Sequence, residues 1–297
     1  MNPTSPPLNI MKFNKIAAIY TAYKPDHKFI ERINFILDKC EIVIVVDNTP
    51  GCHKFPDNLK KIKVIQDGVN KGLGSALNIG ITAAKKLQCD AVLLLDQDST
   101  PDKALLDKLE ASIFDLGIEK ICVGPKFIDD GVESYSNLNI NKTGYVKVSC
   151  LPTSGMMFGI AENQAIENFS EELFLDFVDF DWCWRMGKNY GWSMYCIPEA
   201  EMPHRLGLAQ KSFFGLKYHI PSPFRHYFQF RDTLKLISYV YVPTYSKFRL
   251  GVILFPKLLI YPWILDNGIE RLQWMLKGIR DFFNGISGVG SARNLLK

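Results

Sequence analysis

The chain has 297 residues, of which 47% are hydrophobic and 22% charged, and its formal net charge is +4 at pH 7. This composition is typical of a globular protein and excludes disordered and fibrous classes, and the length allows one large domain or one domain with an extension. The seven cysteines form no CxxC pair and no apolar signal segment precedes them, which favours a reduced cytosolic protein without a zinc site.

Strand-like apolar runs alternate with helical segments through the first two thirds of the chain. The predicted strands are Ile16–Tyr20, Glu41–Asp47, Ile62–Gln66, Ala91–Asp96, Ile121–Phe127, Tyr145–Leu151 and Trp192–Ile197. The predicted helices cover about residues 26–39, 74–87, 101–115 and 179–190. This alternation predicts an α/β fold with a mostly parallel central sheet flanked by helices.

Polar clusters follow three of the predicted strands, at the ends where ligands bind in folds of this class. They are Thr21-Ala22-Tyr23, Asp47-Asn48-Thr49 and Asp96-Gln97-Asp98-Ser99. Asp96 and Asp98 point to the same side of an extended chain, which suits a divalent cation that carries a diphosphate. The alternative is a solvated turn in which Ser99 caps the helix that begins near Pro101. Three such clusters at equivalent strand ends favour a binding site.

A glycine-containing loop precedes the helix predicted from about residue 74. It reads Asn70-Lys71-Gly72-Leu73-Gly74. Two glycines permit close backbone approach, and the N-terminus of a helix can receive an anion. The loop matches neither a Walker A motif nor the GxGxxG fingerprint, which argues against NTPases and dehydrogenases. A plain turn between strand and helix is the alternative interpretation.

A second acidic cluster, with Asp176, Asp179 and Asp181, opens the helix predicted at about residues 179–190. The helix dipole favours a carboxylate in the first turn, so capping explains one of them. Three carboxylates among Phe and Trp side chains exceed that need, and desolvation would raise a pKa and create a better proton acceptor. His204 follows the last predicted strand and is a candidate to complete a metal shell begun by Asp98. A surface or hydrogen-bonded histidine is the alternative.

The C-terminal third differs from the rest in charge and texture. Residues 205–297 contain 14 Lys and Arg against 4 Asp and Glu, whereas residues 1–204 contain 21 against 27. Residues 250–265 are almost wholly apolar, but Pro256, Lys257 and Pro262 interrupt them, so a transmembrane helix is not expected. The segment 269–283 has apolar residues at helical spacing. This pattern is typical of an interfacial helix, and equally of a helix that packs on the catalytic domain or in a dimer contact.

In their order along the chain, these motifs resemble those of glycosyltransferase family 2, whose members are inverting enzymes with the GT-A fold. The resemblance covers about residues 14–207 and rests on the strand-end clusters, the 70–78 loop, the acidic helix start and His204. The Asp96–Ser99 motif, residues 173–185 and the segment His219–Tyr227 are similar to the bacterial rhamnosyltransferase branch. We therefore expect a GT-A catalytic domain at residues 14–210, followed by a basic, aromatic and mainly helical extension at residues 211–297.

The resemblance also implies roles for single residues. Asp179 matches the Asp of the family's Glu-Asp pair and is the expected general base, but Val178 replaces the Glu, which leaves Asp181 as a rival. Asp98 and His204 are the expected ligands of Mg²⁺ or Mn²⁺. The expected donor-binding residues are Thr21, Tyr23, Asp47, Asn48, Lys71, Gly72, Gly74 and Asp96. The expected acceptor-binding residues are Trp182, Arg185, Lys217, Arg225 and Arg231.

Substrates and location follow from the same resemblance. It implies a nucleotide-sugar donor, expected to be dTDP-β-L-rhamnose, and a polyprenyl-diphosphate-linked saccharide acceptor in the synthesis of O-antigen lipopolysaccharide or another surface polysaccharide. The enzyme would lie on the cytoplasmic face of the bacterial cell membrane without a nucleic-acid partner, and a homodimer through the C-terminal helices is compatible with the pattern. The alternatives are a family 2 transferase that uses a UDP-hexose, and a membrane- or nucleic-acid-binding adaptor with an inactive catalytic domain. A nucleotidyltransferase is disfavoured, because no Gly- and Arg-rich loop follows the first strand.

Overall fold

The computed structural model describes residues 13–56, 60–129, 132–133, 144–161, 165–203, 210–213, 216–219 and 221–295. The main sheet contains β1 (Ile16–Ala22), β2 (Ile42–Asp47), β3 (Ile62–Gln66), β4 (Ala91–Asp96), β5 (Ile121–Asp129), β6 (Val132–Glu133), β7 (Val146–Val148), β8 (Met156–Gly159) and β9 (Ser193–Pro203). A separate hairpin consists of β10 (Gln210–Phe213) and β11 (Leu216–His219). The helices are α1 (Phe29–Asn34), α2 (Leu73–Lys86), α3 (Lys103–Leu116), α4 (Val178–Tyr190), α5 (Arg225–Ser238), α6 (Thr244–Ile264) and α7 (Gly268–Phe283), followed by a short 3₁₀ helix, Gly290–Leu295.

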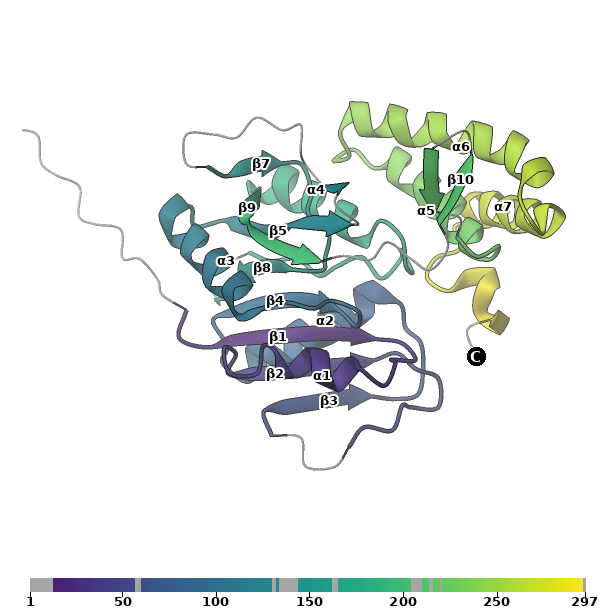
Figure 1. Ribbon diagram of the computed structural model, residues 1–297. Helices are drawn as coiled ribbons and strands as arrows, with labels where there is room; N and C mark the ends of the chain where they lie inside the picture. Colours follow the sequence, from purple (N-terminus) through teal and green to yellow (C-terminus); the bar gives the residue numbers. More distant parts are fainter. Residues whose placement is uncertain are drawn as a thin grey trace, which may run out of the picture.

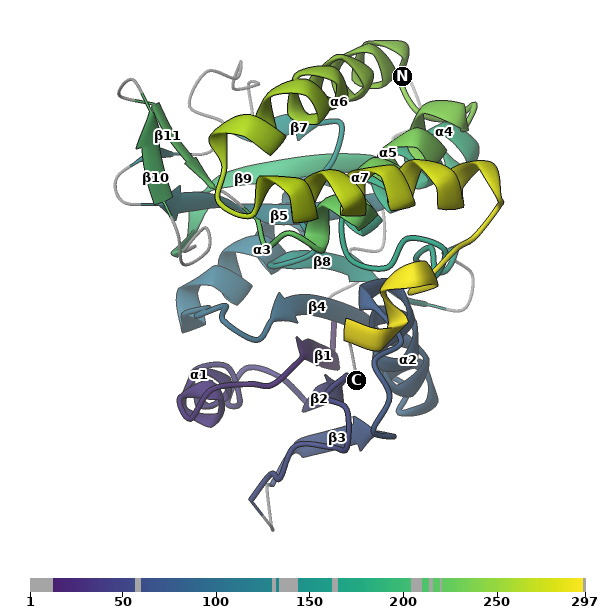
Figure 2. The same cartoon turned by 90° about the vertical axis from the view of Figure 1, so that its right-hand side faces the viewer.

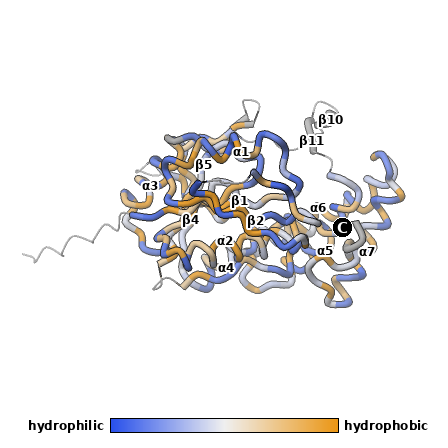
Figure 3. The backbone as a smooth tube through the Cα atoms, turned by 90° about the horizontal axis from the view of Figure 1, so that it is seen from below, coloured by the Kyte–Doolittle hydropathy of each residue, from blue (hydrophilic) through white to orange (hydrophobic). Residues whose placement is uncertain are grey.

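The nine-stranded sheet has the order β3-β2-β1-β4-β8-β5-β9-β7, with β6 beside β5 (Figure 1). Strands β3, β2, β1 and β4 are parallel to one another. The residues of β1, β2 and β4 are mostly buried, and Figure 3 shows these strands as a hydrophobic stretch of the chain. Helices α2 and α4 cover one face of the sheet, and α1 and α3 cover the other. Strands that are buried on both faces need helices on both sides of the sheet. The structure has them, and the predicted α/β architecture is confirmed.

The parallel register brings the predicted strand-end clusters to one edge. Thr21 lies beside Asp96 across β1 and β4, and Ala22 lies beside Asp47 across β1 and β2. Because neighbouring parallel strands end together, residues far apart in the sequence share this edge. The edge is therefore the first place to look for a binding site.

Two features of the sheet half depart from the sequence-based expectation. Strand β8 was not predicted, and it lies between β4 and β5, antiparallel to both. Its four buried residues are too short a run to reveal their conformation by periodicity. Helix α1 is shorter than the predicted residues 26–39, because residues 35–39 form turns instead of a continued helix.

The C-terminal helices lie beyond the carboxyl ends of the parallel strands (Figures 1 and 2). Helix α7 packs closely on α5, since a Cβ at Gly278 would come within 2.4 Å of the Tyr227 carbonyl oxygen. Helix α6 continues through Pro256 and Pro262, the two prolines that interrupt its apolar sequence. Within the described part of the chain, no helix is long and apolar enough to cross a membrane. The extension is helical, as expected, and its start at residue 211 stays a prediction.

Candidate active site

Asp96 and Asp98 lie where β4 leaves the sheet, with Asp96 partly buried and Asp98 exposed on the following turn. The Asp96 backbone N–H donates to Ser99 Oγ at 3.1 Å, and the Ser99 hydroxyl also contacts the hydroxyl of Ser154. Helix α3 is capped by Asp102, whose side chain accepts from the Leu105 N–H at 2.6 Å. Ser99 therefore shapes the turn that carries the carboxylates, and the alternative in which it caps the helix is wrong.

Asp179 joins these carboxylates from the first turn of α4. Burial, followed by the charges of Asp98 and Asp179, raises the pKa of Asp96 to about 7. Burial also raises the pKa of Asp179 to about 6, although its carboxylate accepts a hydrogen bond from the Phe180 N–H at 2.8 Å, which opposes the shift. A carboxylate whose proton affinity is raised by burial and by two neighbouring carboxylates is typical of a functional site.

Gln97, between the two acidic residues, joins this turn to β1 and α1. Its side-chain oxygen accepts from the Tyr23 N–H at 2.7 Å, and its backbone carbonyl accepts from Arg32 Nε at 2.8 Å. Thr21 and Tyr23 are partly buried at the same edge. The structure thus brings the predicted residues Thr21, Tyr23, Asp96 and Asp98 together.

Asp47 organises the loop that follows β2. One carboxylate oxygen accepts from the N–H and hydroxyl of Thr49, at 3.0 and 2.6 Å, and the other accepts from the His53 N–H at 2.9 Å. Only 2% of Asp47 is exposed. The neighbouring Asn48 donates from its amide to the Gly72 carbonyl at 2.9 Å, which connects this loop to the glycine-containing loop.

Gly72 and Gly74 allow a close approach of protein backbone from another segment. A Cβ at Gly72, whose φ is +87°, would come within 2.7 Å of the Phe174 carbonyl oxygen. A Cβ at Gly74 would come within 2.2 Å of the Ser170 carbonyl oxygen. At both glycines the close approach is to the segment that leads into α4, and their expected role in donor binding stays a prediction. Lys71 is exposed and forms an ion pair with Asp67.

Asp181, the rival base, is enclosed. It is 1% exposed, forms an ion pair with Arg185 at 3.0 Å, and accepts a hydrogen bond from the Tyr241 hydroxyl. A carboxylate held in this way has no access to an acceptor hydroxyl in this conformation, because it is already surrounded by its own partners. Asp179 is the more accessible of the two, and the ranking of the two bases stays a prediction.

Three of the expected acceptor-binding residues form contacts within the protein itself. Trp182 is fully buried, stacks on Phe169 and donates its indole N–H to the Glu167 carbonyl. Arg185 binds Asp181, Glu167 and the Asn168 carbonyl. Arg231 is fully buried and forms an ion pair with Asp232 at 2.6 Å. Burial excludes Trp182 and Arg231 from direct contact with an acceptor in this structure, which corrects the expectation for these two residues.

The remaining expected residues are distributed as follows. Arg225 is 38% exposed at its side chain and forms an ion pair with Asp176 at 2.6 Å. Lys217 belongs to β11, but its side chain lies outside the described residues, as does the whole of His204. In the described ranges, no group of three or more His, Cys, Asp or Glu side chains has an arrangement that could hold a metal ion.

Several site residues were not predicted from the sequence. Ser154 reaches the Asp96–Ser99 turn from the loop before β8, and Tyr241 reaches Asp181 from the segment after α5. The polar run Thr153-Ser154-Gly155 before an apolar run was a usable signal for Ser154. Tyr241 had no such signal, since its contact depends on how the C-terminal helices pack.

Comparisons with known proteins match this chain to glycosyltransferases. The family model "Glycosyl transferase family 2" matches residues 26–172. The dTDP-rhamnosyl transferase RfbF of Shigella flexneri is 29% identical over 293 residues, which span 93% of this chain and 97% of RfbF.

Solved structures match the fold at low sequence identity. Residues 1–349 of S. aureus TarS in complex with UDP-GlcNAc give a TM-score of 0.55 at 15% identity, covering 92% of this chain and 81% of that one. GalNAc-T7 with UDP, GalNAc and Mn²⁺ gives a TM-score of 0.52 at 12% identity, and this chain spans only 54% of its length. These likenesses establish the GT-A fold.

Proposed function

The chain belongs to glycosyltransferase family 2, and from this premise we propose that it transfers L-rhamnose from dTDP-β-L-rhamnose to a polyprenyl-diphosphate-linked saccharide. Such a step builds O-antigen or another bacterial surface polysaccharide. The observation that carries the choice of sugar is the similarity to a dTDP-rhamnosyl transferase along almost the whole length of both chains. A UDP-hexose is the competing donor, because the structural neighbours were solved with UDP and UDP-GlcNAc.

In the proposed reaction, Asp179 is the general base. Its carboxylate takes the proton of an acceptor hydroxyl while that oxygen attacks the anomeric carbon from the face opposite the nucleotide, so the configuration inverts. Its raised pKa supports this role, because a base with a pKa near 6 is ionised at neutral pH and still attracts a proton. Asp181 keeps a positioning role through Arg185 and Tyr241.

The donor nucleotide would occupy the strand-end edge. Thr21 and Tyr23 would line the pocket, and Asp47 and Asn48 would shape the loop beside the base and ribose through the contacts described above. Lys71 would approach the nucleotide from the glycine-containing loop, where it is exposed. Asp96 would face the ribose and the metal's coordination shell.

The carboxylates at this edge would share a divalent cation with the oxygens of the donor diphosphate, since the described side chains by themselves form no group of three metal ligands. Asp98 is exposed beside Asp96, whose pKa is raised first by burial and then by the negative charges of Asp98 and Asp179, and a cation would relieve the part that comes from charge. Asp98 would hold Mg²⁺ or Mn²⁺ through a carboxylate oxygen, the hard donor that these ions prefer, and His204, as the second expected ligand, would contribute an imidazole nitrogen. When bound, the ion would stabilise the negative charge that develops on the departing diphosphate.

The C-terminal helices supply a surface suited to the cytoplasmic face of a membrane. Helix α6, which lies wholly within the described residues, buries none of its side chains and contains no acidic residue. Its outward aromatic residues include Tyr245, Phe248, Phe255 and Trp263, the last of which is 86% exposed. Exposed aromatic and basic side chains favour an anionic membrane surface, where a polyprenyl-linked acceptor resides. A dimer through the same face is the competing arrangement.

The proposal is tested by the melting temperature of the purified protein with nucleotide sugars and Mg²⁺ or Mn²⁺. A ligand that binds only the folded state raises the melting temperature, and at equal concentration the tighter ligand raises it more. We expect dTDP-rhamnose to stabilise the protein more than dTDP-glucose, UDP-glucose or UDP-GlcNAc do at the same concentration. Equal or stronger stabilisation by a UDP-hexose would remove rhamnose from the proposal and leave the family assignment intact.

A further inference from the structure

The segment 169–177 leads directly into α4 and to Asp179, and two parts of the protein hold it. From the α2 side, the Leu73 N–H donates to the Phe174 carbonyl at 2.9 Å, and the Asn78 side chain bonds to the Phe169 backbone in both directions. From the C-terminal side, the Phe174 ring stacks on Phe228 of α5 at 4.9 Å. The segment therefore lies between the donor half of the protein and the C-terminal helices.

The turn just before α4 has an unusual backbone conformation. Phe177, the residue before the helix, has a φ of +67°, in the left-handed region that a bulky side chain rarely adopts. Such a conformation persists only where the surroundings impose it. It lies two residues before Asp179, so what holds this turn also determines where the carboxylate points.

Arg225 of α5 binds the carboxylate of Asp176, the residue just before Phe177 in this turn. Its Nε donates to both carboxylate oxygens of Asp176, at 3.0 and 3.2 Å, and its Nη2 donates to Oδ1 at 2.6 Å. The Asp176 side chain is 11% exposed, so the pair is partly shielded from water. A forked contact of this kind restricts orientation as well as distance, because the guanidinium is planar and rigid.

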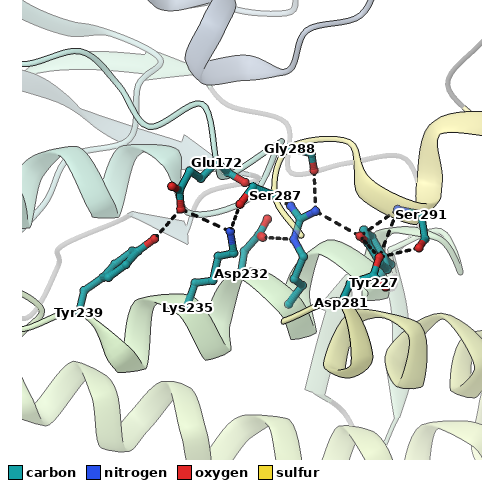
Figure 4. A network of polar contacts seen from close by, with 10 residues as sticks. Glu172, Tyr227, Asp232, Lys235, Tyr239, Asp281, Ser287, Gly288 and Ser291 are labelled. Carbon is teal, nitrogen blue, oxygen red and sulfur yellow. Dashed lines mark hydrogen bonds and ion pairs between the residues drawn. The ribbon is translucent and has the colours of Figure 1, made fainter. Parts of the chain in front are cut away.

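Further along α5, a buried polar network connects this helix to the same segment (Figure 4). Arg231 donates to the carbonyls of Gly288 and Glu172, at 2.6 and 3.4 Å, and forms the ion pair with Asp232. Lys235 contacts the Glu172 carboxylate and Ser287. Helix α5 is thus bonded to the segment 169–177 at Glu172 as well as through Arg225 at Asp176. These contacts make α5 a rigid support for the turn.

We propose that Arg225 is a positioning residue for the transfer reaction: through Asp176 it holds the left-handed turn at Phe177 and so directs Asp179 toward the acceptor. This inference rests on Asp179 being the base, as proposed above. It replaces the sequence-based expectation that Arg225 binds the acceptor. The two roles differ in a measurable way, because a positioning residue acts only through Asp176, whereas an acceptor-binding residue acts on the affinity for the acceptor.

The test is a double-mutant cycle in the full-length protein with Asp176→Asn, Arg225→Met and the double variant. Each single variant should lower kcat by about 10- to 100-fold, the range expected when a reacting group is misplaced. The double variant should be no worse than either single one, and the KM for the acceptor should stay within about twofold of wild type. Arg225→Lys, which keeps the charge but lacks the fork, should be intermediate.

Arg280→Met is the matched control, since it removes an arginine that pairs with Asp281 on α7 and is 60% exposed at its side chain. Its kcat should equal that of wild type. The rise in melting temperature with dTDP and metal, measured for every variant, shows whether the donor half is folded. Asp176→Asn is the variant least prone to unfold, because asparagine has nearly the size of aspartate. Additive losses in the double variant, or a raised acceptor KM with unchanged kcat for Arg225→Met, would overturn the proposal. Failure of the proposed function looks different, because wild type itself would then lack rhamnosyl transfer.

Discussion

The sheet half of the molecule and its C-terminal helices place charge in opposite ways. In the sheet half, apolar strands fill the interior and the carboxylates Asp96, Asp98 and Asp179 gather at one edge. In the helical part, Arg231 and Asp232 are fully buried, whereas α6 exposes most of its large apolar side chains. Buried charges need partners, and exposed apolar surface needs a cover. The sheet half therefore gathers its charges at the candidate site, whereas the helical part combines a buried polar network with an exposed apolar face on α6.

The largest effect should follow the loss of an edge carboxylate. Asp98→Ala should reduce transfer by about 100- to 1,000-fold, the range for removal of a group that stabilises charge in the transition state. Asp98 is exposed and supports no core packing, so the melting temperature should stay unchanged. The measurement is initial-rate transfer with metal present. Full activity would show that the acidic edge is not the catalytic centre.

Stability should depend most on the buried charges of the helical part. Asp232→Ala should lower the free energy of unfolding by about 3–5 kcal/mol, because it leaves the Arg231 guanidinium buried without its carboxylate partner. As the control, Asp107→Ala removes an exposed pair with Lys39 in the sheet half and should cost less than about 1 kcal/mol. Denaturant unfolding of both variants tests the comparison, and equal losses would refute it.

The apolar surface of α6 should govern binding to vesicles. The double variant Phe255→Ser/Trp263→Ser should bind vesicles with anionic lipid about 10-fold more weakly, since each exposed aromatic side chain contributes through burial in the interface. Phe35→Ser, which replaces an exposed aromatic residue outside α6, is the matched control. Co-sedimentation measures both. Unchanged vesicle binding together with loss of a dimer would assign this face to a second copy of the chain.

The smallest predicted effect concerns the pH dependence of stability in metal-free buffer. The folded-state pKa of Asp96, about 7, lies above its unfolded value, so the folded state loses stability as pH rises from about 4 through about 7. Asp96→Asn lacks the contribution of this carboxyl and should be more stable than wild type by about 1 kcal/mol or more at about pH 8. The two proteins should be alike near pH 4. Denaturant midpoints at both pH values measure the difference, and a gain that does not change with pH would contradict it.

Local sequence patterns predicted which residues lie at the carboxyl ends of the parallel strands, but not the long-range contacts that hold this edge of the sheet in place. Asp47 and Asp96 could be placed because apolar runs reveal buried strands, and parallel strands end at a common edge. The contact of Gly74 with Ser170 could not be predicted, since it joins segments almost a hundred residues apart and leaves no periodic signal. The burial of Arg231 was missed for a similar reason: its basic, aromatic surroundings look the same in a sequence whether they are exposed or enclosed.

The most direct test of the account is rhamnosyl transfer by wild type, Asp179→Asn and Asp181→Asn, followed as dTDP release from dTDP-β-L-rhamnose with a polyprenyl-diphosphate-linked saccharide. Loss of a general base reduces turnover by about 100- to 10,000-fold. Asp179→Asn should show that loss while dTDP still raises its melting temperature, and Asp181→Asn should retain measurable transfer. Turnover by Asp179→Asn at the wild-type rate, or turnover of UDP-hexoses in place of dTDP-rhamnose, would contradict the account.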